Sequence, residues 1–162
     1  MGFFAKIVRR IFGAKTLKAP PRRRFIVKVG FPAGMSEHSV ILRAIYNEFG
    51  TKGSGKGFKT ARGGGFGGPV PERPFFRNAM RANRHGYKVI MGQQGARILR
   101  GETTIAQVLR KLGSRAQGDV QGSITALTSP PNSPTTISLK GSSKPLIDTG
   151  EMWQAVTFRV EE

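Results

Sequence analysis

The alternation of apolar and polar positions predicts a strand near each end of the chain. In "RFIVKVGF" (residues 24–31) every second residue from Phe25 to Phe31 is apolar, and in "AVTFRVEE" (residues 155–162) the same holds from Val156 to Val160. A period of two is typical of a strand that buries one face. We expect the two strands to pair in a small antiparallel sheet.

Apolar residues three or four positions apart predict helices between these strands. A helix starts at Ser36 and ends at Gly50, a second opens with Pro74, a third runs from Thr104 to Leu127, and a short one starts at Ser133. Their apolar positions are Val40, Ile41, Ala44, Ile45 and Phe49 in the first, Phe75, Phe76, Ala79 and Met80 in the second, and Ile105, Val108, Leu109, Leu112, Ala116, Val120, Ile124 and Leu127 in the third. The predicted fold class is α+β, a small antiparallel sheet packed with several helices.

Proline and glycine divide the chain into an arm and one domain. Residues 1–24 form a basic arm that ends in "KAPPRRR", and residues 25–162 form a single α+β domain. The domain contains a long glycine-rich loop at about residues 51–71, whose composition favours a flexible segment without a packed element. Within the arm, "MGFFAKIVRRIFGAKTL" has the spacing of an amphipathic helix, which we expect to pack on protein and not on a membrane.

The charge of the chain is unevenly distributed. The formal net charge is +18, with eight Lys or Arg and no acid in residues 1–24, fourteen against two acids in residues 52–115, and three against five in residues 116–162. Such a surplus favours a polyanionic neighbour, either nucleic acid or an acidic protein surface. The uneven distribution would also suit a head-to-tail contact between identical subunits.

Candidate chemistry is sparse in this sequence. It has no Cys and only two His, His38 and His85, which stand far apart, so we expect no disulfide, no metal centre and no cofactor. The stretch "GTKGSGK" (residues 50–56) has the spacing of a phosphate-binding loop, but Gly57 stands where the Mg²⁺-ligating hydroxyl is needed.

The tripeptide Asp148-Thr149-Gly150 resembles the catalytic motif of aspartic proteases. An aspartic protease needs a second carboxylate and a covering flap, and few residues follow Asp148. A helix start explains more residues, with Asp148 as N-cap and Glu151 completing a capping box. The sequence therefore predicts that the protein is not an enzyme.

Basic residues in two places are candidate subunit or partner contacts. In the glycine-rich loop these are Lys52, Lys56, Lys59 and Arg62, and along the second helix they are Arg73, Arg77, Arg81 and Arg84, followed by Lys88. The helical set recurs at intervals of three and four residues, which places a cationic stripe on one helix edge. The stripe is either a solvated face or a contact with phosphates or a partner.

Four segments in order resemble the neck, or tail-completion, proteins of tailed bacteriophages, which include head–tail joining, minor tail and virion morphogenesis proteins. The segments are "FIVKVGF" (25–31), "IYNEFGT" (45–51), "VPERPFFRNAM" (70–80) and "SPPNSPTTISLKGSSKPLIDTGEMWQAVTFRV" (129–160). The resemblance implies a non-catalytic structural protein that assembles as a ring, six-fold in this family, between the head connector and the tail tube or tail terminator. Its location would be the virion neck, and the host cytoplasm during assembly.

This chain departs from the family's pattern in its basic arm and in its glycine-rich loop, which replaces a short link. Either addition could contact DNA in the lumen transiently or an acidic neighbouring ring. The alternative function is a basic nucleic-acid-binding protein associated with RNA or the ribosome. Against it, Phe75, Phe76, Trp153 and Phe158 occupy core-like positions, so no platform for stacking bases is evident.

Overall fold

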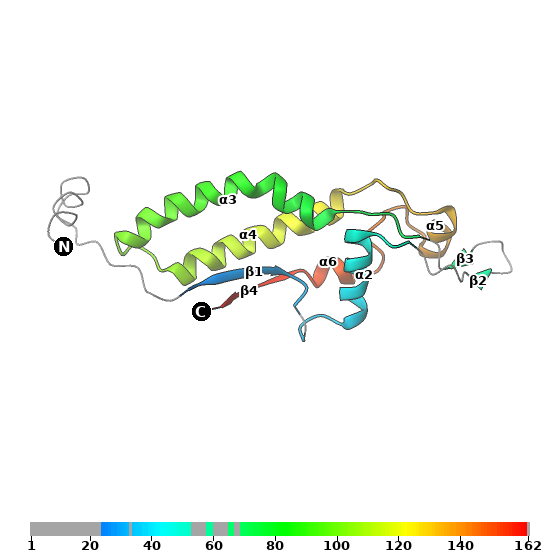
Figure 1. The fold of residues 1–162 in the computed structure, drawn as a ribbon, viewed down its shortest axis with the longest axis horizontal. Helices are drawn as coiled ribbons and strands as arrows, with labels where there is room; N and C mark the ends of the chain where they lie inside the picture. Colours follow the sequence, from blue (N-terminus) through cyan, green and yellow to red (C-terminus); the bar gives the residue numbers. More distant parts are fainter. Residues whose placement is uncertain (1–23, 33, 53–57, 60–64, 67–68, 162) are drawn as a thin grey trace.

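The computed structural model describes residues 24–161, apart from residue 33 and residues 53–57, 60–64 and 67–68 (Figure 1). Nearly all of the basic arm, with its predicted amphipathic helix, lies outside the described residues. In chain order the elements are β1 (Ile26–Gly30), α2 (His38–Phe49), β2 (Phe58–Lys59), β3 (Gly65–Phe66), α3 (Phe75–Leu99), α4 (Ile105–Ala126), α5 (Pro134–Lys140), α6 (Glu151–Gln154) and β4 (Thr157–Glu161). The predicted α+β class is confirmed.

The two predicted strands pair as expected. β1 and β4 run antiparallel, with Ile26 opposite Glu161 and Gly30 opposite Thr157. Lys28 on β1 forms an ion pair with Glu161, Nζ to Oε2 2.7 Å, across the solvent-facing side of the sheet. Because the strands come from the two ends of the described chain, their pairing closes the fold.

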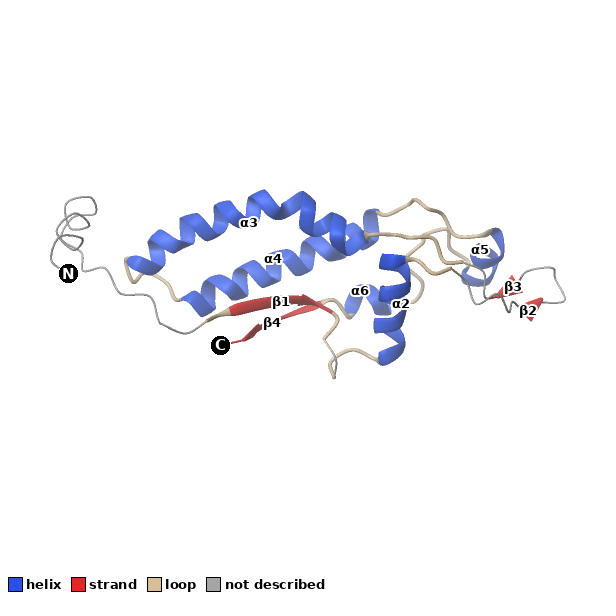
Figure 2. Cartoon of the chain, in the orientation of Figure 1, coloured by secondary structure: helices blue, strands red, loops and turns tan. Residues whose placement is uncertain are grey.

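Helices α3 and α4 form an antiparallel pair, and α4 lies between α3 and the sheet (Figure 2). Ser123 Oγ donates to the Phe75 carbonyl over 2.8 Å, and Tyr87 Oη donates to Asp119 Oδ2 over 2.8 Å. Burial of the phenol, together with its bond to Asp119, raises the pKa of Tyr87. These contacts hold the first half of α3 against the second half of α4.

The strongest periodic pattern in the sequence corresponds to α4. Thr104 caps the helix by accepting from the Gln107 amide, and the Gln107 side chain returns to the Thr104 amide, which completes a capping box. The buried positions of α4 are Val108, Leu109, Gly113, Ala116, Val120 and Ile124. Apart from the glycine, all five belong to the predicted apolar set.

Gly113 is where the α4 backbone meets the sheet. A methyl group added at Gly113 would lie 2.3 Å from Cδ2 of Phe158 on β4. An aromatic ring therefore fills the space beside this glycine. Because Cγ of the ring would lie only 2.7 Å from the methyl group, rotation of the ring about its Cβ–Cγ bond cannot relieve the contact.

We therefore expect Gly113→Ala to lower the free energy of unfolding by about 1–3 kcal/mol through overpacking. Gly118→Ala is the matched control in the same helix, because nothing lies within 4 Å of a methyl group added there. That change should raise stability by up to about 1 kcal/mol through helix propensity. Urea unfolding of both variants checks the pair, and equal changes in the two would contradict the packing.

The hydrophobic core lies where α2, α3, α4 and the segment before β4 meet. Its members are Val40, Ala44, Phe75, Ala79, Val120, Ile124, Leu146, Met152 and Val156. Phe31 adds an edge-to-face contact with Phe75, with ring centroids 6.4 Å apart. This core orients the start of α3 against the end of α2.

The predictions for α2, the glycine-rich loop and α5 have different outcomes. α2 begins at His38 with Glu37 as N-cap and no side-chain cap; the predicted cap, Ser36, instead donates from Oγ to the Ala155 carbonyl over 3.5 Å. The glycine-rich loop is not wholly irregular, because β2 and β3 pair antiparallel within it. α5 is as predicted, since Ser133 accepts from the Thr136 amide and Gly141 ends the helix in the left-handed region.

Candidate assembly surface

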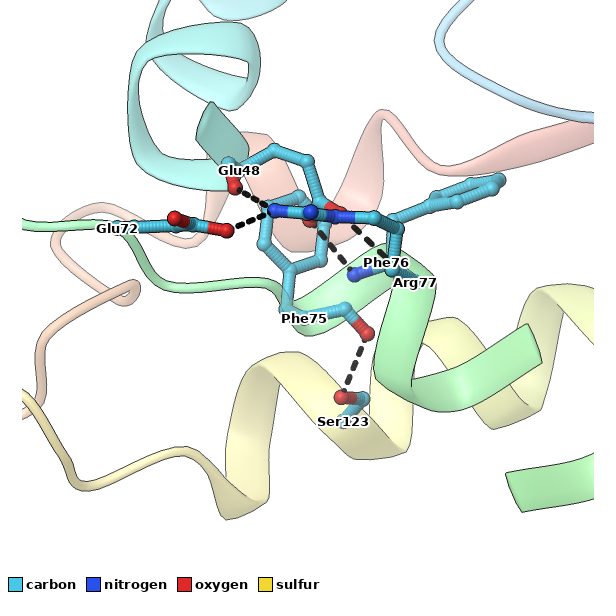
Figure 3. A network of polar contacts seen from close by, with 6 residues as sticks. All are labelled: Glu48, Glu72, Phe75, Phe76, Arg77 and Ser123. Atoms are coloured by element: carbon cyan, nitrogen blue, oxygen red, sulfur yellow. Dashed lines mark hydrogen bonds and ion pairs between the residues drawn. The ribbon is translucent and has the colours of Figure 1, made fainter. Parts of the chain in front are cut away.

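The buried carboxylate of Glu48 links the end of α2 to the start of α3 (Figure 3). Glu48 is only 6% exposed. Its carboxylate accepts hydrogen bonds from the Phe76 amide over 2.9 Å and from the Arg77 amide over 3.1 Å. The first amides of a helix have no acceptor within the helix, and Pro74 at the N-cap offers no side-chain bond. A carboxylate from α2 therefore caps α3, at the positive end of its dipole.

Arg77 returns this interaction from α3. Its Nε donates to Glu48 Oε1 over 2.9 Å, and its Nη2 donates to the Glu48 carbonyl over 2.8 Å and to Glu72. The hydrogen bond to Glu48, followed by the one to Glu72, raises the pKa of Arg77. The guanidinium carbon also lies 5.2 Å from the centroid of the Phe49 ring, a cation–π contact.

Arg73, just before α3, makes a second network. It is 5% exposed, and its guanidinium donates to Asn47 Oδ1 over 3.0 Å, to the carbonyls of Pro130 over 2.9 Å and Pro131 over 3.0 Å, and to Asn132 Oδ1 over 3.2 Å. Burial lowers the pKa of Arg73. One side chain thus joins α2, the start of α3 and the segment before α5.

These contacts connect segments that the sequence analysis singled out. Asn47 and Glu48 come from residues 45–51, Arg73 and Arg77 from residues 70–80, and the acceptors of Arg73 also from residues 129–160. The remaining segment, residues 25–31, contains β1, which pairs with β4 in residues 129–160. The four segments therefore form one hydrogen-bonded unit in space.

An apolar groove opens beside this unit. It has a volume of about 340 Å³, and we call it the α2 groove; it is lined by Phe31, Ile41, Ala44, Ile45, Glu48, Phe49, Phe75, Phe76 and Arg77. Phe49 is 64% exposed and Ile45 is 44% exposed. Both belong to the predicted apolar face of α2, but the buried residues of this helix are Val40, Ala44 and Glu48.

A larger cavity of about 500 Å³ lies on another side of α2, bounded by residues 69–73, 131–136 and 145–152. Most of its charged groups already have partners in the chain, although Asp148 lines it without an ion pair to a described residue. Arg43 Nη2 pairs with Glu151 Oε2 at 2.5 Å and lowers the pKa of Glu151, and Lys140 Nζ donates to the Lys144 carbonyl over 3.1 Å. Burial lowers the pKa of Lys140. This cavity shows no convergent set of groups aimed at a ligand.

The predicted cationic contacts occupy different environments. Lys56 and Arg62 lie outside the described residues, Lys59 lies in β2, and Lys52 is exposed. Arg73 is buried and Arg77 is bound to two carboxylates, so the predicted stripe is not a uniform solvated edge. Arg81 and Arg84 are exposed on α3, as is Lys88. Periodicity alone could not separate the bound arginines from the exposed ones, because the acceptors of Arg73 and Arg77 lie outside α3.

The predicted cap at Asp148 is wrong in its details. A helix does start here, but α6 begins at Glu151, its N-cap is Gly150 with φ of 86°, and no side chain caps it. Glu151 binds Arg43 on α2 and does not close a capping box. The left-handed conformation of Gly150 moves the start of the helix two residues beyond Asp148.

Two absences concern the residues that the structure describes. Within them, no three His, Asp or Glu residues gather closely enough to hold a metal ion. No helix in this part of the chain combines the length and the apolar character needed to cross a bilayer.

Comparison of the chain with protein-family models, with curated proteins and with solved structures gives no match.

Proposed function

We propose that the protein is a structural subunit of a tailed-bacteriophage virion, which forms a ring at the head–tail neck and joins the head connector to the tail. It has no catalytic role in this proposal. The proposal rests on the four resembling segments and on one observation, the α2 groove beside the network that joins them. The occupant of the groove is a neighbouring copy of this chain.

The groove has the character of an unfilled interface. A ring needs a heterologous contact, in which one patch of each subunit meets a different patch of the next. Large apolar side chains exposed together mark such sites in soluble proteins, and aromatic residues are the usual anchors. The cation–π contact with Arg77 holds the Phe49 ring in position as such an anchor.

A catalytic reading lacks comparable support. In the described part of the chain, Glu48 and Arg77 bond to each other and to backbone. Arg73 bonds to two asparagine side chains and two carbonyls, and Tyr87 bonds to Asp119 between two helices. These are structural roles, because each group satisfies a partner that burial would otherwise leave unpaired.

The second candidate, a basic nucleic-acid-binding protein, has one observation in its favour. Trp153, predicted to be in the core, is 40% exposed on α6. Binding of single-stranded nucleic acid needs aromatic side chains interleaved with cations. Trp153 lies on α6, a four-residue helix beside α2, whereas the exposed arginines Arg81 and Arg84 belong to α3 (Figure 1).

Ile45→Asp tests the proposed interface. Ile45 lines the groove, so a carboxylate there should be buried without a partner when a second copy docks. We expect the dissociation constant between subunits to rise at least about 100-fold, which corresponds to about 3 kcal/mol. Size-exclusion chromatography with light scattering would show wild-type oligomers and a monomeric variant.

Val89→Asp is the matched control, because Val89 is 43% exposed on α3 and does not line the groove. It should leave the oligomer intact. Loss of assembly in both variants, or in neither, would show that the groove is not the subunit contact. Thermal unfolding of the Ile45 variant establishes that the monomer is folded.

A further inference from the structure

The outer edge of α3 carries cations without acidic partners. We call it the α3 edge; it consists of Arg81, Arg84 and Lys88, which are exposed and spaced three and four residues apart. None of the three forms an ion pair with another described residue. α3 itself contains no Asp or Glu in its 25 residues.

The acids of this chain are largely paired with its other cations. Those in ion pairs are Glu48, Glu72, Glu102, Asp119, Glu151 and Glu161. Of the described acids, Glu37 and Asp148 remain, one beside α2 and one before α6. A second copy of the described domain therefore offers few unpaired carboxylates to receive the α3 edge.

A polyanion from outside the chain fits the edge better. Arg81 and Lys88 are seven residues apart, so the edge is about 10 Å long at 1.5 Å per residue. Duplex DNA presents one charge per about 1.7 Å of its axis, and several phosphates would lie within that length. The large exposed aromatics whose burial is described, Tyr46, Phe49 and Trp153, are on α2 and α6, so none of them gives the edge a platform for unpaired bases.

We infer that the α3 edge contacts the phosphate backbone of double-stranded DNA. The inference rests on the proposed function, in which the duplex passes through the neck ring. Contacts to phosphates position a protein without reading bases. The binding is therefore independent of sequence and weakens steeply with salt, which lets the duplex slide past.

The test compares two full-length triple variants with the wild-type protein. One is Arg81→Gln, Arg84→Gln and Lys88→Gln in the α3 edge. The other is Arg110→Gln, Lys111→Gln and Arg159→Gln, a control that removes the same charge from exposed positions on α4 and β4. Affinity for a random-sequence 30-base-pair duplex is measured by fluorescence anisotropy between 50 and 200 mM salt.

For the edge variant we expect the slope of log affinity against log salt to shrink by about 2.7, at about 0.9 for each lost phosphate contact. The control should shrink it by less than about 1. Equal changes in the two variants, or no change in the edge variant, would overturn the inference.

Two further measurements separate the alternatives. Binding to polyglutamate is measured in parallel, and loss of that binding alone in the edge variant would assign the edge to an acidic protein and overturn the inference. The mass of the edge variant is measured by light scattering. If the edge variant forms an intact ring and binds DNA normally, only the inference is contradicted. If the wild-type protein never forms a ring, the proposed function is contradicted.

Discussion

Replacing Glu48 with alanine should lower the free energy of unfolding by about 3 kcal/mol. The change removes the acceptor of the Phe76 and Arg77 amides and of the Arg77 guanidinium. Each buried donor left without a partner costs about 1–3 kcal/mol, and removing one partner of a buried ion pair costs about 3–5 kcal/mol. The lower figure applies because the Arg77 side chain is 39% exposed and can reach water.

Glu72→Ala is the matched control for Glu48. Glu72 also pairs with Arg77, but its side chain is 52% exposed, so its loss should cost less than about 1 kcal/mol. Guanidinium unfolding followed by circular dichroism measures both variants. If the two carboxylates prove equivalent, Glu48 does not cap α3, and the geometry of the α2 groove has another origin.

Arg73→Met should also cost about 3 kcal/mol. Methionine fills the apolar part of the space, but it leaves the acceptors on Asn47, Pro130, Pro131 and Asn132 without their donor. Hydrogen exchange should rise at the Thr136 and Ile137 amides, which bond to Ser133 at the end of the segment that this side chain ties to α3. Arg73→Lys should recover only part of the loss, since an ammonium lacks the planar fork that reaches several acceptors at once.

Arg81→Met provides the comparison for Arg73. Arg81 is exposed on the same helix, and surface substitutions of this kind usually change stability by less than about 0.5 kcal/mol. If Arg81→Met and Arg73→Met had the same effect, the cost would come from helix charge and not from the buried network.

Elements with a local signal could be predicted from the sequence. β1 and β4 show a period of two, α4 shows the helical period over 22 residues, and α5 carries its own serine cap and terminal glycine. Such signals depend on neighbours in the chain, so they survive whatever the tertiary structure adds.

The assembly surface depends on contacts that no local pattern contains. Glu48 is a polar residue on the buried side of α2, and its acceptor role appears only when α3 brings two free amides to it. The residues from Asp148 to Glu151 fitted the local pattern of a capping box. In the structure, Glu151 pairs with Arg43, and Gly150 is the N-cap of α6. In both places a long-range partner decides the role of the side chain.

The apolar face of α2 illustrates a different limit. Its helical spacing grouped Ile45 and Phe49 with Val40 and Ala44, but spacing shows only that residues share an apolar face. The structure covers one part of that face with the chain's own core and leaves Phe49 and Ile45 beside an open groove. This division is what turns a predicted core helix into a candidate subunit contact.

Electron microscopy of the purified wild-type protein tests the central claim most directly. If this chain is the subunit of a neck ring, concentrated protein should show closed annular particles of uniform diameter, with six copies in each. A field of single small particles at every concentration, with light scattering reporting 17.6 kDa, would contradict it.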